Sequence, residues 1–276
     1  MAVAEGKNDS GVDLFAVRSV LFLPASNPRA IAKARDSDAD LVVLDLEDAV
    51  KPGDKRDARD AAVDAVASTW PMPVAIRVNG VGTEWHSLDL DAVARSKANL
   101  VVVPRAISAH LVHGVAEAVG KPVLAMIETA AGVLAAAQIA GNAAGLIAGT
   151  NDLRADLRLP LSATREPISA SLQMIVLSAR AAGVAVFDGV FNGLDDADGF
   201  LREAEQGRQL GFDGKSLIHP NQIRPCHQAF APSDTEVARA RALVDAFQGG
   251  AERLGDEMIE RMHVDAAQRV LDRAGA

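Results

Sequence analysis

Acidic and basic residues recur in this sequence directly after short apolar runs. Unbroken runs of Val, Ile and Leu are typical of parallel strands that are buried on both faces. Because the carboxyl ends of parallel strands meet at one edge of a sheet, we expect the side chains that follow these runs to lie close together and form a reaction site. They are Asp45, Glu47, Asp48, Arg77, Arg105, Glu128, Asp152 and His219.

Glu128 and Asp152 follow two consecutive apolar runs, and no histidine or cysteine stands near either of them in the sequence. Two carboxylates at one sheet edge form the hard-oxygen environment that Mg²⁺ prefers, with water and substrate oxygens completing the coordination. An alternative is that each carboxylate caps the helix that follows it, in Glu128-Thr129-Ala130-Ala131 and Asn151-Asp152-Leu153.

Arg77 interrupts the apolar run VAIRVNG, where a charge must be paired or must point to the open end of the strand. Its guanidinium offers a fork for a substrate carboxylate or a developing enolate oxygen. An internal ion pair with Glu47 or Asp48 is the alternative, and the two roles are compatible. Asp45, Glu47 and Asp48 would repel one another without a cation such as Arg77 nearby.

Other polar residues allow a structural interpretation as readily as a chemical one. His219 precedes Pro220 and suits a helix-starting turn as well as catalysis, and Lys215 is able to reach a phosphate or to cap the end of the sheet. Cys226 and His227 are adjacent rather than at metal-ligand spacing, which favours a structural role. The remaining histidines fall in helical segments and are expected to be solvated: His86, His110, His113 and His263.

Eight apolar runs alternate with helical stretches through most of the chain, which predicts a parallel sheet. Eight is the number that a closed (β/α)8 TIM barrel needs, and residues 17–231 have a suitable length. A doubly wound open sheet is the alternative, but FLPASNPR stands where its Gly-rich phosphate-binding turn would follow the first strand. The strands begin at Ser19, Leu41, Val74, Leu100, Val123, Gly145, Val184 and Lys215, with helices over 55–68, 108–119, 129–140 and 164–182.

Both ends of the chain depart from this alternation. Residues 1–16 are polar and predict a loose N-terminal arm. Residues 232–276 predict a C-terminal helical extension, with helices over 233–248 and 256–274 and no further strand. Gly249 and Gly250 separate these helices and would let the second one swing, to cover the barrel mouth or reach a neighbouring subunit.

Composition restricts the classes of partner. The formal net charge is -9 and the isoelectric point is about 5.2, so no basic field exists for nucleic acid or for an anionic membrane. No run approaches the roughly 18 apolar residues of a membrane span, and the first residues lack the apolar core of a secretory leader. With a single cysteine, Cys226, these features predict a cytoplasmic protein.

Several segments together resemble the citrate lyase β-subunit and malyl-CoA lyase family, within the superfamily of phosphoenolpyruvate/pyruvate-type barrels. They follow the family's order, with a weaker match in EMIERMHVDAAQRVL near the end. The matching segments are RSVLFLPASNPR from Arg18, VLDLEDAV from Val43, RVNG from Arg77, MIETAAGV from Met126, the turn from Gly149 to Leu153, and GFDGKSLIHPNQI from Gly211.

The resemblance implies a (β/α)8 barrel that binds Mg²⁺, with Mn²⁺ as a substitute, and a 2-hydroxy or 2-keto acid beside the metal. In CoA-using members an acyl-CoA enters across the barrel mouth, and a carboxylate from the C-terminal segment of a neighbouring subunit transfers the proton, commonly in a homotrimer. By this resemblance Glu128 and Asp152 bind metal, Arg77, Gly149, Thr150 and Asn151 bind substrate, and Arg77, Glu47 and Glu260 are catalytic.

Three positions depart from the family pattern. Asn151 replaces a glutamate, Arg105 replaces a lysine, and Glu260 stands where CoA-using members have aspartate in Met-Ile-Asp. The extra methylene of Glu260 moves the acid by more than about an ångström, which matters for proton transfer, and Asp256 on the same predicted helix is the fallback acid.

The leading hypothesis is a Mg²⁺-dependent carbon–carbon lyase that cleaves or forms a 3-hydroxyacyl-CoA of the malyl-CoA or citramalyl-CoA type through an enolate. A CoA-independent aldolase that releases pyruvate or oxaloacetate is an alternative, and so is a subunit that works only with an acyl-carrier partner. A non-catalytic acyl-CoA binding protein is a further alternative.

Overall fold

The computed structural model describes residues 11–275, and its first unit is a closed barrel of eight parallel strands. Each strand pairs with the next, and β8 pairs with β1, which confirms the (β/α)8 fold and excludes the open sheet. All eight predicted strands are present. They are β1 (Ser19–Pro24), β2 (Leu41–Asp45), β3 (Val74–Arg77), β4 (Leu100–Val103), β5 (Val123–Ile127), β6 (Gly145–Ala148), β7 (Ala185–Asp188) and β8 (Gly214–Leu217).

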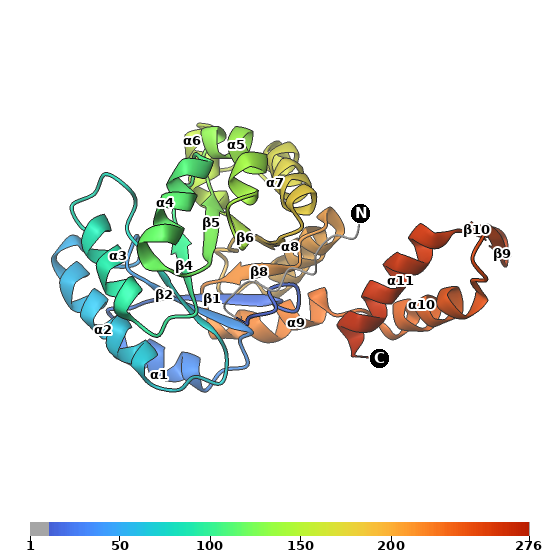
Figure 1. Cartoon of the computed structure of the whole chain (residues 1–276), viewed down its shortest axis with the longest axis horizontal. Helices are drawn as coiled ribbons and strands as arrows, with labels where there is room; N and C mark the ends of the chain where they lie inside the picture. Colours follow the sequence, from blue (N-terminus) through green and yellow to red (C-terminus); the bar gives the residue numbers. More distant parts are fainter. Residues whose placement is uncertain (1–10, 276) are drawn as a thin grey trace. The chain divides into compact units, whose positions relative to one another are not determined.

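Helices connect successive strands and surround the barrel (Figure 1). Several begin after a capping side chain, with Asn27, Ser108 and Thr129 each accepting a backbone N–H of the first turn. The helices are α1 (Pro28–Arg35), α2 (Lys55–Ala67), α3 (His86–Arg95), α4 (Ala109–Val119), α5 (Ala130–Ala140), α6 (Thr150–Asp156), α7 (Ser169–Ala182), α8 (Ala197–Leu210) and α9 (Ile223–Phe230), with 3-10 turns η1 (Pro52–Asp54), η2 (Glu166–Ile168) and η3 (Pro220–Gln222).

The barrel interior is packed with apolar side chains, among them Val20, Leu41, Leu100 and Phe187. Leu14 is also buried in this core, so the last residues of the predicted 1–16 arm belong to the barrel. Residues 1–10, the rest of that arm, lie outside the described residues.

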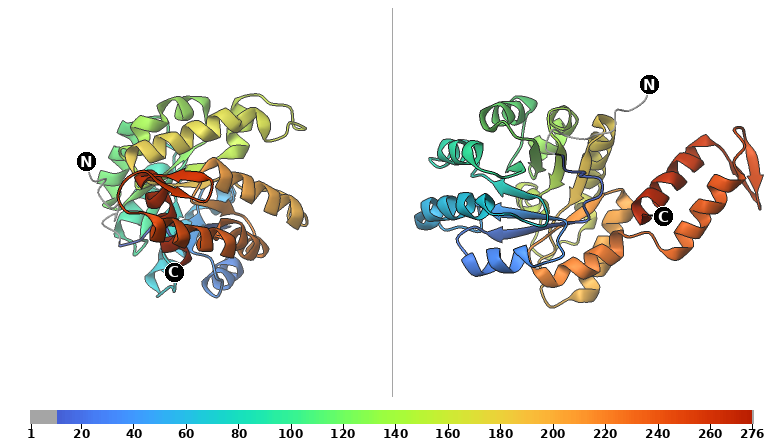
Figure 2. Two further views of the ribbon diagram at one scale, coloured as in Figure 1. Left: turned by 90° about the vertical axis from the view of Figure 1, so that its right-hand side faces the viewer. Right: turned by 60° about the horizontal axis from the view of Figure 1, so that its bottom comes forward.

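A second compact unit follows the barrel, with the division between Ala229 and Phe230. Its helices α10 (Asp234–Ala246) and α11 (Arg261–Ala274) pack through Ala240, Ala267 and Leu271. Between them lies an antiparallel ribbon of β9 (Glu252–Leu254) and β10 (Glu257–Ile259) (Figure 2). The expectation of two helices without a strand is therefore wrong: the sequence Gly255-Asp256 forms a two-residue turn, with Gly255 at φ 65°, and the last helix begins only at Arg261.

Across residues 11–275, no helix has the length and apolar character needed to cross a membrane.

Candidate active site at the carboxyl ends of the barrel strands

A cavity of about 450 Å³ opens at the carboxyl ends of the strands. Its wall combines apolar side chains such as Phe22, Val190 and Ile218 with a ring of polar ones, the composition expected of a small-molecule site. The polar lining residues come from β2, β3, β5, α6 and β8 and the loops that follow them: Asp45, Asp48, Arg77, Glu128, Thr150, Asn151, Asp152 and Ser216.

The side chain of Arg77 is fixed by Asp45, the residue that pairs with it on the neighbouring strand β2. Arg77 Nε and Nη2 donate to the two carboxylate oxygens of Asp45 at 2.6 and 2.7 Å. Nη1 lies 2.7 Å from a carboxylate oxygen of Glu47 and 3.9 Å from one of Asp48. Nη1 thus lies within ion-pair distance of Glu47 and Asp48, as predicted, but the two-bond partner is Asp45, which the sequence did not single out for this role.

Glu47 contacts Arg77 but is not among the residues that line the cavity. Burial raises the pKa of Glu47 to about 8, and the nearby charges of Asp48, Glu128 and Asp45 add to the shift, while Arg77 opposes it. Near neutral pH this side chain therefore keeps its proton. Its contacts make it a residue that positions Arg77.

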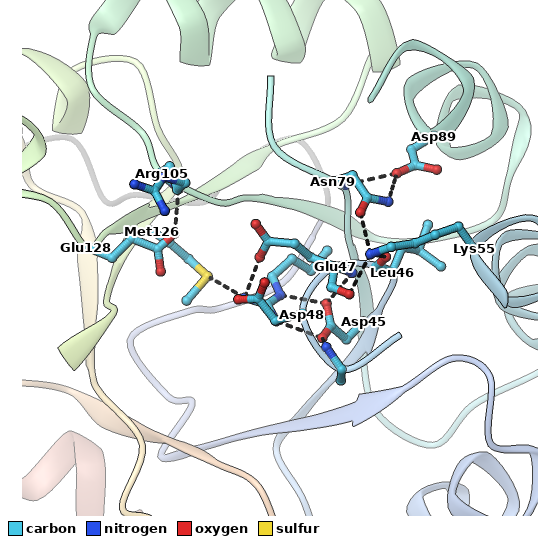
Figure 3. Close-up of polar contacts among 12 residues, drawn as sticks. Asp45, Leu46, Glu47, Asp48, Lys55, Asn79, Asp89, Arg105, Met126 and Glu128 are labelled. Atoms are coloured by element: carbon cyan, nitrogen blue, oxygen red, sulfur yellow. Dashed lines mark hydrogen bonds and ion pairs between the residues drawn. The ribbon is translucent and has the colours of Figure 1, made fainter. Parts of the chain in front are cut away.

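Lys55, a residue that the sequence did not single out, holds the loop that carries Glu47 (Figure 3). The buried ammonium donates to the main-chain oxygens of Leu46 and Glu47 at 2.7 and 2.6 Å and to Asn79 Oδ1 at 2.6 Å. Asn79 in turn donates its main-chain and side-chain N–H groups to Asp89 Oδ2. The segment RVNG is thus a link between the Arg77 strand and the loop after β2.

Glu128 does not cap α5, because Thr129 Oγ1 accepts the N–H of Gly132 and fills that role. Glu128 Oε1 instead accepts the main-chain N–H of Arg105 at 2.6 Å. A Cβ on Gly149 would lie 2.5 Å from Glu128 Oε2, so only glycine leaves room for this carboxylate. Burial raises the pKa of Glu128 to about 7, against the lowering effect of the bond from Arg105.

Asp152 is the third residue of α6, and no side chain caps that helix. Its carboxylate is partly exposed and lies 3.8 Å from Arg105 Nη1. The helix-cap alternative thus fails for both carboxylates, and the two face one cavity. The predicted substrate residues Gly149, Thr150 and Asn151 line the same cavity, with Asn151 and Asn192 exchanging side-chain amide bonds at 2.8 and 3.2 Å.

Several other predicted residues have structural roles. His219 Nδ1 accepts the N–H of Asn221 at the start of η3. Lys215 is fully buried and pairs with Asp188 and Glu203 at 3.0 and 2.8 Å. His86 is buried, with Nδ1 2.7 Å from the main-chain oxygen of Asn79, so its predicted solvation is wrong.

The pair Cys226 and His227 also lies away from the cavity. Cys226 is buried, and burial raises its thiol pKa to about 12, which keeps the thiol protonated and unreactive. His227 Nε2 lies 2.8 Å from Ser19 Oγ and 3.3 Å from Asp40. These contacts tie α9 to the start of β1, as the structural interpretation expected.

Glu260 lies in the second unit, as the residue that precedes α11. Its main-chain N–H donates to His263 Nδ1 at 2.9 Å. Asp256, the fallback acid, sits in the turn between β9 and β10. The two acids therefore do not share a helix, contrary to expectation.

Comparison with known proteins decides the family. Residues 18–220 match the model of the HpcH/HpaI aldolase/citrate lyase family. The chain belongs to this family. Membership supports a lyase activity and agrees with the resemblance found in the sequence.

Two relatives illustrate the similarity. A (3S)-malyl-CoA thioesterase of Cereibacter sphaeroides (strain ATCC 17025) is 39% identical over 271 residues, which cover 94% of this chain and 95% of the relative. The citrate lyase subunit beta of Leuconostoc mesenteroides subsp. cremoris is 31% identical over 283 residues, which cover 94% and 93%.

Solved structures also superpose on this chain. The CitE protein of Mycobacterium tuberculosis, in complex with magnesium, acetoacetate and coenzyme A, superposes with a TM-score of 0.85 at 34% identity, over 95% of this chain and 100% of that one. RipC from Yersinia pestis superposes with a TM-score of 0.71 at 29% identity, over 82% and 100%.

Proposed function

We propose that this chain is a Mg²⁺-dependent carbon–carbon lyase that cleaves or forms a 3-hydroxyacyl-CoA of the malyl-CoA or citramalyl-CoA type. One observation carries the proposal: Glu128 and Asp152, freed from helix capping, face a single cavity together with Arg77. A CitE protein crystallised with magnesium, acetoacetate and coenzyme A supports it.

The donor set suits Mg²⁺. Within residues 11–275 no three His, Cys, Asp or Glu side chains converge as a metal-binding cluster, so an all-protein cage for a transition metal is absent there. Two carboxylates with space for water and substrate oxygens match the way proteins hold Mg²⁺, and Mn²⁺ would be a substitute. A bound Mg²⁺ would supply a Lewis acid for the oxygens of a 2-oxo acid.

The charge balance of the cavity also favours a cation. Four acidic residues line it, Asp45, Asp48, Glu128 and Asp152, against one lining cation, Arg77. Asp45 already neutralises Arg77 through two hydrogen bonds. An anionic acid would meet net repulsion in this cavity unless a divalent cation offsets the carboxylates. We therefore propose that the acid binds only with Mg²⁺.

Arg77 orients the acid in this scheme. Nε and Nη2 donate to Asp45, and Nη1 lies against Glu47 and also donates to Met126 Sδ at 3.8 Å, so the second hydrogen of Nη2 is the one available to a substrate oxygen. Asp45 thus fixes the orientation of the Arg77 guanidinium, which lines the cavity. Gly149, Thr150 and Asn151 form the opposite wall and would hold the same ligand.

A second cavity of about 530 Å³ adjoins the first and shares Phe22, Leu23, Pro24 and Ile218 with it. Arg29 and Lys33 of α1 line this cavity, beside apolar residues of β1. The two cations would bind the phosphate groups of CoA, and the apolar wall would contact its pantetheine arm. We assign the CoA half of the substrate to this cavity and the acid half to the first.

We further propose a homotrimer in which Glu260 of one chain transfers a proton at the site of a neighbour, with Asp256 as the fallback. Complementation tests this arrangement. Co-expressed Glu260→Gln and Asp152→Asn chains, each inactive alone, should regain roughly a quarter of the wild-type activity, because random assembly pairs an intact barrel with an intact acid in about that fraction of sites. Two inactive chains that stay inactive together, in oligomers shown to be mixed, would place the acid within one chain.

The direct test of the activity uses purified full-length chain with Mg²⁺ and a panel of malyl-CoA and citramalyl-CoA isomers. Cleavage yields acetyl-CoA with a 2-oxo acid, whereas a CoA-independent aldolase would release pyruvate or oxaloacetate from free acids. A subunit that needs an acyl-carrier partner would stay inert until the carrier is added. Absence of cleavage with every ester would refute the proposed reaction.

Thioester hydrolysis is a second candidate, because the 39% identical relatives are named (3S)-malyl-CoA thioesterase. The same cavity would hold the same ester, but water would attack the thioester carbonyl. The products then differ: hydrolysis of malyl-CoA gives malate and a free CoA thiol, and cleavage gives acetyl-CoA and glyoxylate. A thiol reagent together with an assay for glyoxylate distinguishes the two reactions in one experiment.

A further inference from the structure

Arg105 contacts both carboxylates of the candidate metal pair through two different parts of the residue. Its main-chain N–H donates to Glu128 Oε1 at 2.6 Å, and its guanidinium Nη1 lies 3.8 Å from Asp152 Oδ1 (Figure 3 shows Arg105 beside Glu128). The first contact is short and partly buried, whereas the second joins two side chains that are 58% and 41% exposed. The backbone contact is therefore the firm one.

The backbone of Arg105 adopts a conformation that side chains disfavour. Its φ is 47°, and among residues 11–275 only Arg158, at 55°, is another non-glycine residue with positive φ. The Cβ atom of an L-residue crowds the main chain in this region, so the conformation persists only where the surroundings enforce it. Such residues concentrate at functional sites.

The surroundings of Arg105 do enforce it. In an extended strand successive N–H groups point to opposite sides, but here the N–H groups of Arg105 and Ala106 both face the end of β5. The first donates to Glu128 Oε1 and the second to the main-chain oxygen of Met126 at 3.0 Å. Gly132 of α5 packs against the same loop, where a Cβ would lie 2.6 Å from the main-chain oxygen of Ala106.

We propose that Arg105 is a positioning residue for the metal pair, whose left-handed backbone aims its N–H at Glu128 and fixes that carboxylate for a divalent cation. This inference rests on the proposed function, because it assumes that Glu128 and Asp152 bind Mg²⁺. The guanidinium has a separate and weaker role: it places a positive charge beside Asp152, so its removal alone should not weaken Mg²⁺ binding.

A series of substitutions separates the backbone from the side chain. Arg105→Gly, Arg105→Asn, Arg105→Ala and Arg105→Val all remove the guanidinium and keep the N–H, but they tolerate a left-handed backbone in decreasing order. Titration calorimetry of the full-length chain with Mg²⁺ alone gives the readout, without any turnover. Circular dichroism checks that each variant is folded.

We expect the Gly and Asn variants to bind Mg²⁺ at least as tightly as wild type, and the Val variant to bind about ten-fold more weakly, the loss typical when a group that orients a metal ligand is disturbed. The Ala variant should fall between them, so the comparison survives if the Val variant does not fold. Arg158→Gly and Arg158→Val are the matched control: Arg158 has the same backbone conformation without a contact to either carboxylate, and its two variants should bind Mg²⁺ equally.

Equal Mg²⁺ affinity across the folded Arg105 variants would overturn the inference while leaving the proposed function intact. A wild-type chain that binds no Mg²⁺ would instead overturn the proposed metal site, and the inference with it.

Discussion

Asp45 and Arg77 face each other across β2 and β3, and Arg77 donates two hydrogen bonds of 2.6 and 2.7 Å to the Asp45 carboxylate. Both side chains are buried, and the pair fixes which edge of the guanidinium reaches the cavity. Fixing a fork in advance lowers the entropy that a substrate loses on binding. The pair is thus a structural basis for acid recognition, and it can be tested separately from the metal site.

Asp45→Asn keeps the size of the side chain and removes its charge. We expect the free energy of unfolding to fall by about 3 kcal/mol, because the Arg77 charge stays buried without its partner. Urea denaturation measures this loss. Unchanged stability would show that the buried Arg77 charge does not depend on Asp45.

Arg77→Lys keeps the charge but loses the planar fork. Affinity for oxaloacetate in the presence of Mg²⁺ should fall by about ten-fold or more, while Mg²⁺ affinity without the acid stays near that of wild type. Paired calorimetric titrations measure both quantities. A parallel loss of Mg²⁺ affinity would mean that Arg77 acts on the carboxylates rather than on the acid.

Lys55→Met removes an ammonium that bonds the main chain of Leu46 and Glu47 and the side chain of Asn79. Since the loop after β2 loses its clamp, we expect kcat to fall by about ten-fold or more, together with a loss of roughly 2 kcal/mol in stability. Kinetics and urea denaturation measure the two effects. Lys97→Met, at an exposed position that lines neither of the two cavities, is the control for removal of a lysine charge and should leave kcat and stability unchanged.

Glu47 makes the folding stability of the metal-free chain depend on pH, and the sign of this dependence follows from its raised pKa. The folded chain keeps the Glu47 proton up to a pKa of about 8, whereas the unfolded chain loses it near 4.5. The folded state therefore binds more protons between these values, and its stability from Glu47 declines as the pH rises from about 4.5 to about 8. Glu47→Gln should flatten this decline in urea denaturation at pH 5, 6, 7 and 8, and an equally steep decline in the variant would rule out Glu47 as its source.

The fold was predictable because buried parallel strands have a strong signature. Runs such as LVVLD and VLAMI are too apolar for anything but a two-sided core, and all eight strands occur where these runs do. The β9–β10 ribbon was missed because three-residue strands show almost no periodicity. Gly255-Asp256, a recognised hairpin turn sequence, was the signal that could have revealed it.

The site was predictable in its members but not in their contacts. The sequence could have excluded Glu128 as the helix cap, because its neighbour Thr129 is a far better N-cap residue. The pairing of Asp45 with Arg77 depends on the register of β2 against β3, and the bond from Arg105 depends on a left-handed backbone; neither is encoded by spacing. Lys55 was missed because a lysine that begins a helix is usually solvated.

The central claim is that Glu128 and Asp152 together hold one Mg²⁺ and that the acid binds through it. The most direct measurement is titration calorimetry with Mg²⁺ and with oxaloacetate on the wild type, Glu128→Gln and Asp152→Asn. Each variant removes one of the two carboxylates proposed to bind the metal, so we expect the affinities for metal and for acid to fall together, by about ten-fold or more. Mg²⁺-dependent acid binding that stays at the wild-type level in both variants would contradict the account.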